Sequence, residues 1–345
     1  MSCCPAKTSC CAAPQDNVHS SVSKFYACEA EKIKAQKPTR IEQVTVCAGF
    51  DPSSCGTDAS TKLYNDALNK IHPELKNASF GCGSPFPPSL AGCSVLDLGS
   101  GMGRDAYILS CLVGKHGRVT GVDMTPTMLQ TASSHAKWHA DAFGYSNVEF
   151  KSGFLEKLPD AGLQSGSYDV VVSNCVINLS TDKRKVLKDT YDLLKPGGEM
   201  YFSDVYVDKP MPENIVKHEL AYNACFSGAL PWDTFQTMTR DIGFCGPFVT
   251  KSFDYAIQPE ELKELLDGYH FWSKTCRLIK PTETSRVANA ITDVTLTYKG
   301  DDTVSEQTFI LSQDIAFKAN EPKTVTNAVA HALMHSRYSK YFAPS

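Results

Sequence analysis

Short apolar runs alternate with amphipathic segments from residue 95 to residue 205, and this alternation constrains the fold more than any other feature of the chain. The apolar runs are typical of buried strands, and the segments between them repeat apolar residues at helical spacing. Strands are predicted at 95–98, 119–122, 148–151, 170–173 and 199–205, and helices at 104–113, from Thr125-Pro126 onward and at 183–194. The alternation predicts an α/β fold with a doubly wound, mostly parallel sheet.

The segments on either side depart from this pattern. Residues 1–40 are predicted to be an N-terminal tail that contains cysteines, and a helix is predicted at 60–77. After about residue 246 the pattern is β-rich at 287–298 and 308–317, and helical at 324–335. We therefore expect three parts: the tail at 1–40, a main domain at 41–246 and a smaller α+β domain at 247–345.

The bulk composition argues against several classes of partner. A net charge of −4 over 345 residues offers no electrostatic basis for binding nucleic acid or a membrane surface. The chain has no run of 18 apolar residues, and its N-terminus lacks the basic and apolar regions of a signal peptide. We expect a cytoplasmic protein whose 14 cysteines are reduced, so that any disulfide would be transient and either catalytic or redox-sensing.

A glycine-rich turn follows the first predicted strand. Gly99, Gly101 and Gly103 have the spacing G-x-G-x-G, which differs from the G-x-G-x-x-G of dinucleotide-binding domains. Asp97 precedes the glycines, and its carboxylate would repel a pyrophosphate but tolerate a cofactor that carries an ammonium group. Asp123 ends the second predicted strand, where an acid suits a ribose diol.

Together these features resemble the S-adenosylmethionine (SAM) site of class I methyltransferases, with an NAD(P)-binding domain as the alternative. The resemblance implies that Met124, next to Asp123, also belongs to the cofactor site. It further implies that Glu156, in the turn after the third strand, flanks the adenine, and that Asn174 lies near the reacting centre. From the residues alone, Glu156 is equally well a solvated acid and Asn174 a turn residue.

Longer motifs resemble the arsenite methyltransferases, which are SAM-dependent and have the class I fold. These motifs are residues 71–74, 80–83, 172–179, 198–206, 243–245 and 276–278, and the similarity extends from about residue 40 to residue 335. It implies that the domain at 41–246 binds SAM and includes an N-terminal arsenic-binding segment. One departure is Ala78-Ser79-Phe80, where the family often has Arg-Tyr-Tyr, so a tyrosine contact to the methyl donor is expected to be lost.

The family uses cysteines at four places, and each has a match here. Cys82 matches through Gly-Cys-Gly, Cys175 through Ser-Asn-Cys-Val-Ile-Asn-Leu, and Cys225 through its segment at 223–230. The fourth is expected to be Cys47, with Cys55 as the alternative. Trivalent arsenic is soft and forms three bonds to thiolates, which the resemblance assigns to Cys82, Cys175 and Cys225.

The resemblance also implies a reaction, the SAM-dependent methylation of arsenite, taken as a thiol conjugate, in arsenic detoxification. The arsenic lone pair is the nucleophile, and no general base is required because arsenic carries no proton to lose. Methylation formally oxidises arsenic, and its reduction is expected to be coupled to a disulfide between cysteines of the enzyme, which thioredoxin or glutathione then reduces. The expected partners are arsenite, methylated trivalent arsenicals and one of these reductants.

Other interpretations remain open at this point. A methyltransferase for a small organic acceptor, such as a sterol, quinone or thiopurine, would share the cofactor motif but would not need the cysteines. A thiol-rich metal-binding or redox-sensing protein would have kept only a vestigial fold. The pairs Cys3-Cys4 and Cys10-Cys11 fit either capture of soft metal or a tail without a required role, and His72 is expected to pack at a helix end rather than bind a ligand. Expected packing residues are Cys93, Cys111, Cys245 and Cys276.

Overall fold

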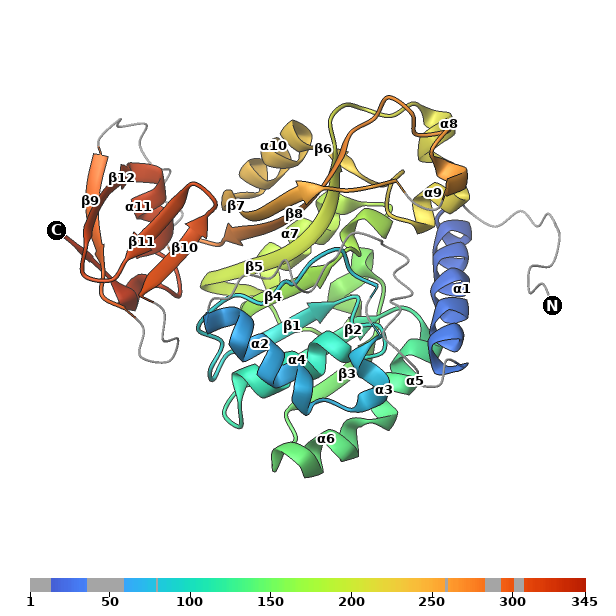
Figure 1. The fold of residues 1–345 in the computed structure, drawn as a ribbon, viewed down its shortest axis with the longest axis horizontal. Coiled ribbons are helices and arrows are strands. Elements are labelled where there is room, and N and C mark those ends of the chain that lie inside the picture. The colour runs from blue at the N-terminus through green and yellow to red at the C-terminus, as the bar shows by residue number, and fades with distance from the viewer. Residues whose placement is uncertain (1–13, 36–58, 79, 258–259, 283–292, 301–306) are drawn as a thin grey trace.

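One large sheet organises the molecule. This computed structural model describes residues 14–35, 59–78, 80–257, 260–282, 293–300 and 307–345. Its main sheet has eight strands in the order β3-β2-β1-β4-β5-β8-β7, with β6 (Leu230–Pro231) beside β5 (Figure 1). Five neighbouring strands, from the edge strand β3 to β5, are parallel: β1 (Ser94–Leu98), β2 (Arg118–Asp123), β3 (Val148–Ser152), β4 (Tyr168–Asn174) and β5 (Leu194–Val207). The predicted α/β class with a doubly wound, mostly parallel sheet is confirmed.

The central strands are buried because helices cover them. Every residue of β1 is buried, and Val170, Val171 and Val172 of β4 are at most 1% exposed. Strands of a parallel sheet that helices cover on both faces have continuous apolar sequences, which is why these strands could be predicted. The larger helices around the sheet are α4 (Arg104–Val113), α5 (Pro126–Ser134), α6 (Ala136–Phe143), α7 (Lys183–Leu193) and α10 (Trp232–Ile242).

Strand order reverses at β1. The chain runs outward from β1 through β2 to β3 and then returns to place β4 on the other side of β1. The loops that follow β1 and β4 are therefore neighbours beyond the carboxyl ends of the strands, where ligands bind in this class of fold. The glycine turn lies in the first of these loops, and Cys175 lies in the second.

Two strands carry the sheet past the domain boundary expected at residue 246. β8 (Phe271–Ile279) pairs antiparallel with β5, and β7 (Cys245–Asp254) pairs antiparallel with β8. The sequence analysis predicted neither strand, because lysine and arginine interrupt the apolar residues of β8. The main sheet continues to residue 279, so the boundary prediction is wrong.

The C-terminal unit is α+β, as expected. One small sheet contains β9 (Asp293–Tyr298), β12 (Pro322–Thr326) and β13 (Phe342–Pro344), and a second contains β10 (Thr308–Ser312) and β11 (Ile315–Lys318). Helix α11 (Asn327–Met334) begins later than predicted, because Thr326 caps it by accepting a hydrogen bond from the Val329 N–H. Of the β-rich segment predicted at 287–298, residues 287–292 lie outside the described residues.

A helix occupies much of the predicted N-terminal tail. α1 (Pro14–Ala35) lies beside α5 and the short helix α9 (Glu219–Asn223), which follows α8 (Glu213–Val216) (Figure 1). The apolar residues that α1 packs against the body of the protein recur every four positions: Val18, Val22, Tyr26 and Ala30. This spacing is helical, but the polar residues between hid it from the sequence analysis. The tail prediction is wrong for residues 14–35.

The helix predicted at 60–77 is two helices, α2 (Ala59–Lys70) and α3 (Pro73–Lys76). They separate because Pro73 has no N–H to continue α2. His72 caps α3, with its Nδ1 accepting a hydrogen bond from the Glu74 N–H at 3.3 Å, so its predicted place at a helix end is confirmed. Among all the helices that the structure describes, none is both long enough and apolar enough to cross a membrane.

A buried ion-pair network joins the C-terminal unit to the main sheet. The fully buried Glu199 of β5 contacts Arg277 of β8 at 2.7 Å and Arg337 at 2.8 Å. The Tyr338 hydroxyl donates to the same carboxylate at 2.5 Å. Burial alone would raise the pKa of Glu199, but the charges of Arg337 and Arg277 hold it below its usual value. The glutamate is therefore ionised, and its single negative charge is shared between two buried guanidinium groups.

Glu199→Ala is expected to lower the free energy of unfolding by about 3–5 kcal/mol, because two buried guanidinium groups lose their counter-charge. Urea denaturation followed by circular dichroism measures this loss. Asp141→Ala, which breaks the exposed Lys137–Asp141 ion pair, is the control and is expected to cost no more than about 1 kcal/mol. Similar costs for the two variants would contradict the importance of the network.

Candidate active site

A pocket opens beyond the carboxyl ends of the central strands. The space within it, including open solvent at its mouth, is about 720 Å³. Residues predicted to bind the cofactor line it, namely Gly99, Gly101, Asp123, Met124, Glu156 and Asn174. Cys175 lines the same pocket, so a cysteine predicted to bind substrate faces the predicted cofactor site.

The turn after β1 presses against the loop after β4. Gly99 has a φ of 71°, and a side chain there would place its Cβ 2.6 Å from Val176 Cγ2. Glycine alone permits both this conformation and this close approach. The Gly101 N–H donates to Asp123 Oδ2 at 2.9 Å, and the Thr125 N–H donates to Oδ1 at 2.8 Å. Asp123 therefore holds the turns after β1 and β2 together.

Asp97 is a buried acid with one carboxylate oxygen that no described residue hydrogen-bonds. It is 3% exposed, and its Oδ2 has no hydrogen-bond partner among the described residues. Burial, and then the nearby carboxylates of Asp105 and Asp123, raise the pKa of Asp97 well above its usual range. Although Asp97 is not itself among the residues lining the pocket, this concentration of acids fits a cationic ligand such as SAM, which carries an ammonium and a sulfonium group.

Gly103 differs in position from the other two glycines. It is the N-cap of α4 with a φ of 87°, and a Cβ there would lie 2.9 Å from the Phe150 ring. It is not among the residues that line the pocket. Its observed place is at the start of α4, where the helix packs closely on β3.

Glu156 is an anchored acid rather than a solvated one. It is 9% exposed and accepts hydrogen bonds from the Ser180 hydroxyl at 2.6 Å and the Thr181 N–H at 2.8 Å. His19 Nε2 lies 3.3 Å from its second oxygen. Burial would raise the pKa of Glu156, but the hydrogen bonds from Ser180 and Thr181 hold it below its usual value. The turn after β3 is thus tied to the loop after β4.

Helix α1 supplies a wall of the pocket that the sequence analysis missed. His19, Val22 and Tyr26 line the pocket from three successive turns of α1. The His19 ring stacks on Phe154 with the ring centroids 4.8 Å apart. The other lining residues that were not predicted are Phe80, Thr125, Met128, Gly153, Leu155, Val176, Leu179 and Ser180. The four-residue spacing in α1 was the available signal for this wall.

Asn174 holds the loop that contains Cys82. Its Oδ1 accepts a hydrogen bond from the Gly83 N–H at 3.2 Å, and its Nδ2 donates to the Gly83 carbonyl at 2.9 Å. A Cβ on Gly81 would lie 2.0 Å from Asn174 Cγ, and one on Gly83 would lie 2.2 Å from Ser203 Oγ. The glycines on both sides of Cys82 therefore let its loop lie directly on the ends of β4 and β5.

Three of the predicted thiol positions meet beside the pocket. Cys82 and Cys175 form a disulfide, with their Cα atoms 5.7 Å apart. The Cys225 thiol donates to the Cys175 carbonyl oxygen at 3.2 Å. All three residues are buried. The cysteines were expected to be reduced, and the disulfide in the structure joins two of those assigned to arsenic.

Cys175 and Cys225 also share an uncommon backbone conformation. Their φ angles are 59° and 65°, in the left-handed region that residues other than glycine seldom adopt. Backbone hydrogen bonds hold both, from the Cys175 N–H to the Ser203 carbonyl at 2.8 Å and from the Cys225 N–H to the Tyr222 carbonyl at 2.9 Å. Strain of this kind costs about 1–3 kcal/mol and is concentrated at functional sites.

The remaining cysteines either do not line the pocket or lie outside the described residues. The latter group includes Cys47 and Cys55, so the structure does not decide between them. Those predicted to be packing residues, Cys93, Cys111, Cys245 and Cys276, are buried or half-buried and do not line the pocket. Burial raises the pKa of each of these four thiols, which makes them poor ligands and supports a packing role.

The fold, the glycine turn after β1 and the acid that ends β2 define a class I methyltransferase. A family model described as a methyltransferase domain matches residues 89–268, which agrees with this assignment. A second family model, described as an arsenite methyltransferase C-terminal domain, matches residues 292–344.

Relatives that match this chain over most of its length narrow the class of methyltransferase further. The arsenite methyltransferase of Mus musculus is 36% identical over 336 residues, covering 95% of this chain and 83% of the relative. The arsenite methyltransferase of Homo sapiens is 38% identical over 299 residues, covering 86% of this chain and 79% of the relative. The crystal structure of an arsenic(III) SAM methyltransferase from Chlamydomonas reinhardtii matches with a TM-score of 0.75 and 38% identity, covering 82% of this chain and 95% of that one. The chain belongs to the arsenite methyltransferase family.

Gly81→Ala is expected to destabilise the protein by about 1–3 kcal/mol, because its Cβ would overlap Asn174. In an Asn174→Ala background the same substitution is expected to cost much less, since the overlapping atoms are absent. Urea unfolding of the parent, the two single variants and the double variant measures the coupling. Additive effects would show that Asn174 does not constrain the Cys82 loop.

Proposed function

We propose that this protein methylates trivalent arsenic, taking arsenite as a thiol conjugate and SAM as the methyl donor, and so serves in arsenic detoxification. The observation that carries the proposal is the convergence of Cys82, Cys175 and Cys225 beside the pocket. Cysteine sulfur is a soft ligand, as trivalent arsenic requires. The proposal is supported by the names of the relatives that this chain matches over most of its length.

The residues of the pocket suit a cationic nucleoside donor. Asp123 would accept hydrogen bonds from the ribose hydroxyls, and Asp97 would compensate the positive charge. Gly99 and Gly101 leave room for the donor against the backbone, and α1 would cover it. When bound, SAM supplies an electrophilic methyl group on its sulfonium sulfur.

The cysteines would hold arsenic by exchange of oxygen for sulfur. Each thiol gives its proton to one hydroxide of arsenite, so that an As–S bond forms, an As–O bond breaks and one water leaves. A thiol conjugate would exchange in the same way and release its thiol instead of water. Three such exchanges leave arsenic with a free lone pair. This lone pair would attack the methyl carbon without help from a general base, and the methyl–sulfur bond would break with its electron pair left on the sulfur of the donor, which becomes a neutral thioether. The role of the protein is to position the two reactants.

The Cys82–Cys175 disulfide supports a redox step within the cycle. Methyl transfer makes arsenic formally pentavalent, and departure of two thiolates as a disulfide would return two electrons to it. The trivalent product would then form a bond to the oxygen of water or the sulfur of a free thiol, with release of one proton. Thioredoxin or glutathione would then deliver two electrons and two protons to the disulfide and become oxidised. The cytoplasm, where these reductants keep thiols reduced, is the compartment that suits this cycle.

The two other candidate functions explain less of the site. A methyltransferase for a small organic acceptor would leave the convergence of three cysteines without a purpose. A thiol-rich metal-binding protein would not need a buried Asp97 whose Oδ2 has no hydrogen-bond partner in the described part of the chain, or the turn that Asp123 holds. Arsenite methylation uses both halves of the site.

Cys225→Ser is expected to remove arsenite methylation almost completely, because serine is a hard, protonated ligand at neutral pH and cannot replace a thiolate. The loss is expected to exceed the roughly 100-fold that removal of an outer-shell partner can cause. Reduced protein is incubated with arsenite, SAM and a thioredoxin system, and methylated arsenic is measured by liquid chromatography and mass spectrometry. The matched control, Cys111→Ser, is expected to keep most of the activity.

Calorimetric titration with SAM is expected to give similar affinities for Cys225→Ser and the parent, which separates loss of the arsenic site from loss of the donor site. Normal arsenite turnover by Cys225→Ser would refute the thiolate site. An absence of methylated arsenic with the parent itself would refute the proposed substrate.

Cys82→Ser is expected to lose methylation of arsenite but retain much of its methylation of a monomethylated trivalent arsenical. The methylated substrate has two exchangeable positions, and Cys175 and Cys225 supply two thiolates from the sheet domain. Cys47→Ser is expected to behave like Cys82→Ser, and Cys55→Ser run in parallel decides which of the two is the fourth thiol. Turnover of both substrates is measured in the same assay, and equal losses on both would contradict this division.

A further inference from the structure

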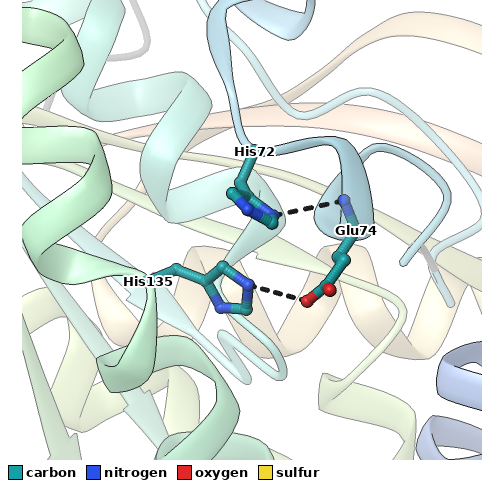
Figure 2. A group of neighbouring side chains, drawn as sticks. All are labelled: His72, Glu74 and His135. Carbon is teal, nitrogen blue, oxygen red and sulfur yellow. Dashed lines mark hydrogen bonds and ion pairs between the residues drawn. The ribbon is translucent and has the colours of Figure 1, made fainter.

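A cluster of metal-ligand side chains lies outside the pocket described above. His72 caps α3, Glu74 lies in α3, and His135 lies at the junction of α5 and α6; Figure 2 shows the three side chains together. One ligand atom from each residue lies within 4.8 Å of the other two. None of the three lines the pocket, so the proposed methyl transfer does not account for the cluster.

The hydrogen bonds of His135 define its tautomer. Its Nδ1 lies 2.9 Å from the Thr131 carbonyl oxygen, and because a carbonyl only accepts, Nδ1 carries the hydrogen. In the neutral ring, Nε2 then presents a lone pair to Glu74 Oε2 at 3.0 Å. Two acceptors at this distance require a proton or a cation between them. The same arrangement, with one ring nitrogen donating to a carbonyl, orients histidines that bind metals.

His139 supports the cluster without joining it. Its Nδ1 lies 2.9 Å from the His135 carbonyl, and its Nε2 accepts from the His72 N–H at 3.1 Å. Its ring, which is 2% exposed, stacks on Tyr107 with the centroids 3.6 Å apart. Both of its nitrogens are engaged, so it orients the backbone of the other two histidines.

We propose that His72, Glu74 and His135 bind a divalent transition-metal ion, with Zn²⁺ as the preferred ion. His72 would bind through Nδ1, the acceptor nitrogen of its neutral ring, and would give up the hydrogen bond from the Glu74 N–H to do so. Two imidazoles and one carboxylate are the donors of many zinc sites that keep a fourth position for water. Zinc bonds of about 2.1 Å place tetrahedral ligand atoms about 3.4 Å apart, so some separations must close by about 1 Å. The Glu74 side chain is 73% exposed and can make this adjustment, and its exposure also gives an ion access from solvent.

The bound ion would join two parts of the methyltransferase domain. α3 precedes the loop that contains Cys82, and α5 contributes Met128 to the pocket. A metal across α3 and the α5–α6 junction would hold the Cys82 segment against the domain, at a site that does not bind substrate. Because the ion binds only the folded arrangement, it also raises the stability of the protein with its concentration.

The test is a titration of the unmodified full-length protein with Co²⁺, followed by visible absorption and then by displacement with Zn²⁺. The parent is expected to give cobalt d–d bands that saturate at one equivalent of Co²⁺ for this site. The variants Glu74→Gln and His135→Ala are expected to bind Co²⁺ at this site at least tenfold more weakly. The parent-minus-variant spectrum is expected to lack thiolate-to-cobalt charge transfer, which separates this site from the cysteines. The control is His270→Gln, because His270 also lies 3.0 Å from a carboxylate, that of Asp254, but belongs to no three-ligand group among the described residues.

Glu74→Gln changes an exposed side chain and is expected to fold, so its melting temperature gives an independent reading. Zn²⁺ is expected to raise the melting temperature of the parent and of His270→Gln by more than that of Glu74→Gln. Identical cobalt spectra and identical zinc shifts in the parent and Glu74→Gln would overturn the proposal and leave Glu74 and His135 as an ion pair that shares a proton. Arsenite methylation is not the readout, so this result stands apart from the proposed function.

Discussion

The adjacency of β1 and β4 is the constraint on which the site depends. Because the strand order reverses there, the glycine turn and the Cys175 loop leave the sheet side by side. Gly99 approaches Val176 so closely that no side chain fits between them. A methyl donor bound on the first loop, as we propose, would therefore lie next to the Cys175 sulfur on the second.

Cys82 and Cys225 are held beside Cys175 by different contacts. Asn174, the last residue of β4, bonds to Gly83 and so holds Cys82 against Cys175. Cys225 follows α9 and reaches the Cys175 carbonyl from a segment after β5. All three cysteines thus gather at the carboxyl end of one strand, beside the pocket.

The sequence predicted those parts of the fold whose signal is local. β1, β4 and α4 appeared within one or two residues of their observed bounds, because buried parallel strands are continuous apolar runs and α4 is amphipathic. β8 did not appear, since its Arg277 is buried only because it pairs with Glu199 of the neighbouring strand β5, which lies far earlier in the sequence. α1 was missed because its apolar spacing is sparse, although its side chains line the pocket.

In the candidate site, too, the residues with a local sequence signal were predicted and those that depend on the tertiary fold were not. The glycines and Asp123 carry their role in a short motif, and the thiols were predicted through resemblance to a family. The hydrogen bonds that anchor Glu156 come from Ser180 and Thr181, which only the tertiary fold brings near. The meeting of His72 with His135 likewise depends on the packing of α3 against the α5–α6 junction, and no local pattern predicts it.

The most direct test of the thiolate site is X-ray absorption at the arsenic K-edge on reduced protein loaded with one equivalent of arsenite. The extended fine structure reports the number and type of atoms bonded to arsenic. A first shell of three sulfur atoms is predicted, and one sulfur should be replaced by oxygen in Cys225→Ser. A shell of oxygen atoms in the parent, or a three-sulfur shell that persists unchanged in Cys225→Ser, would contradict the account.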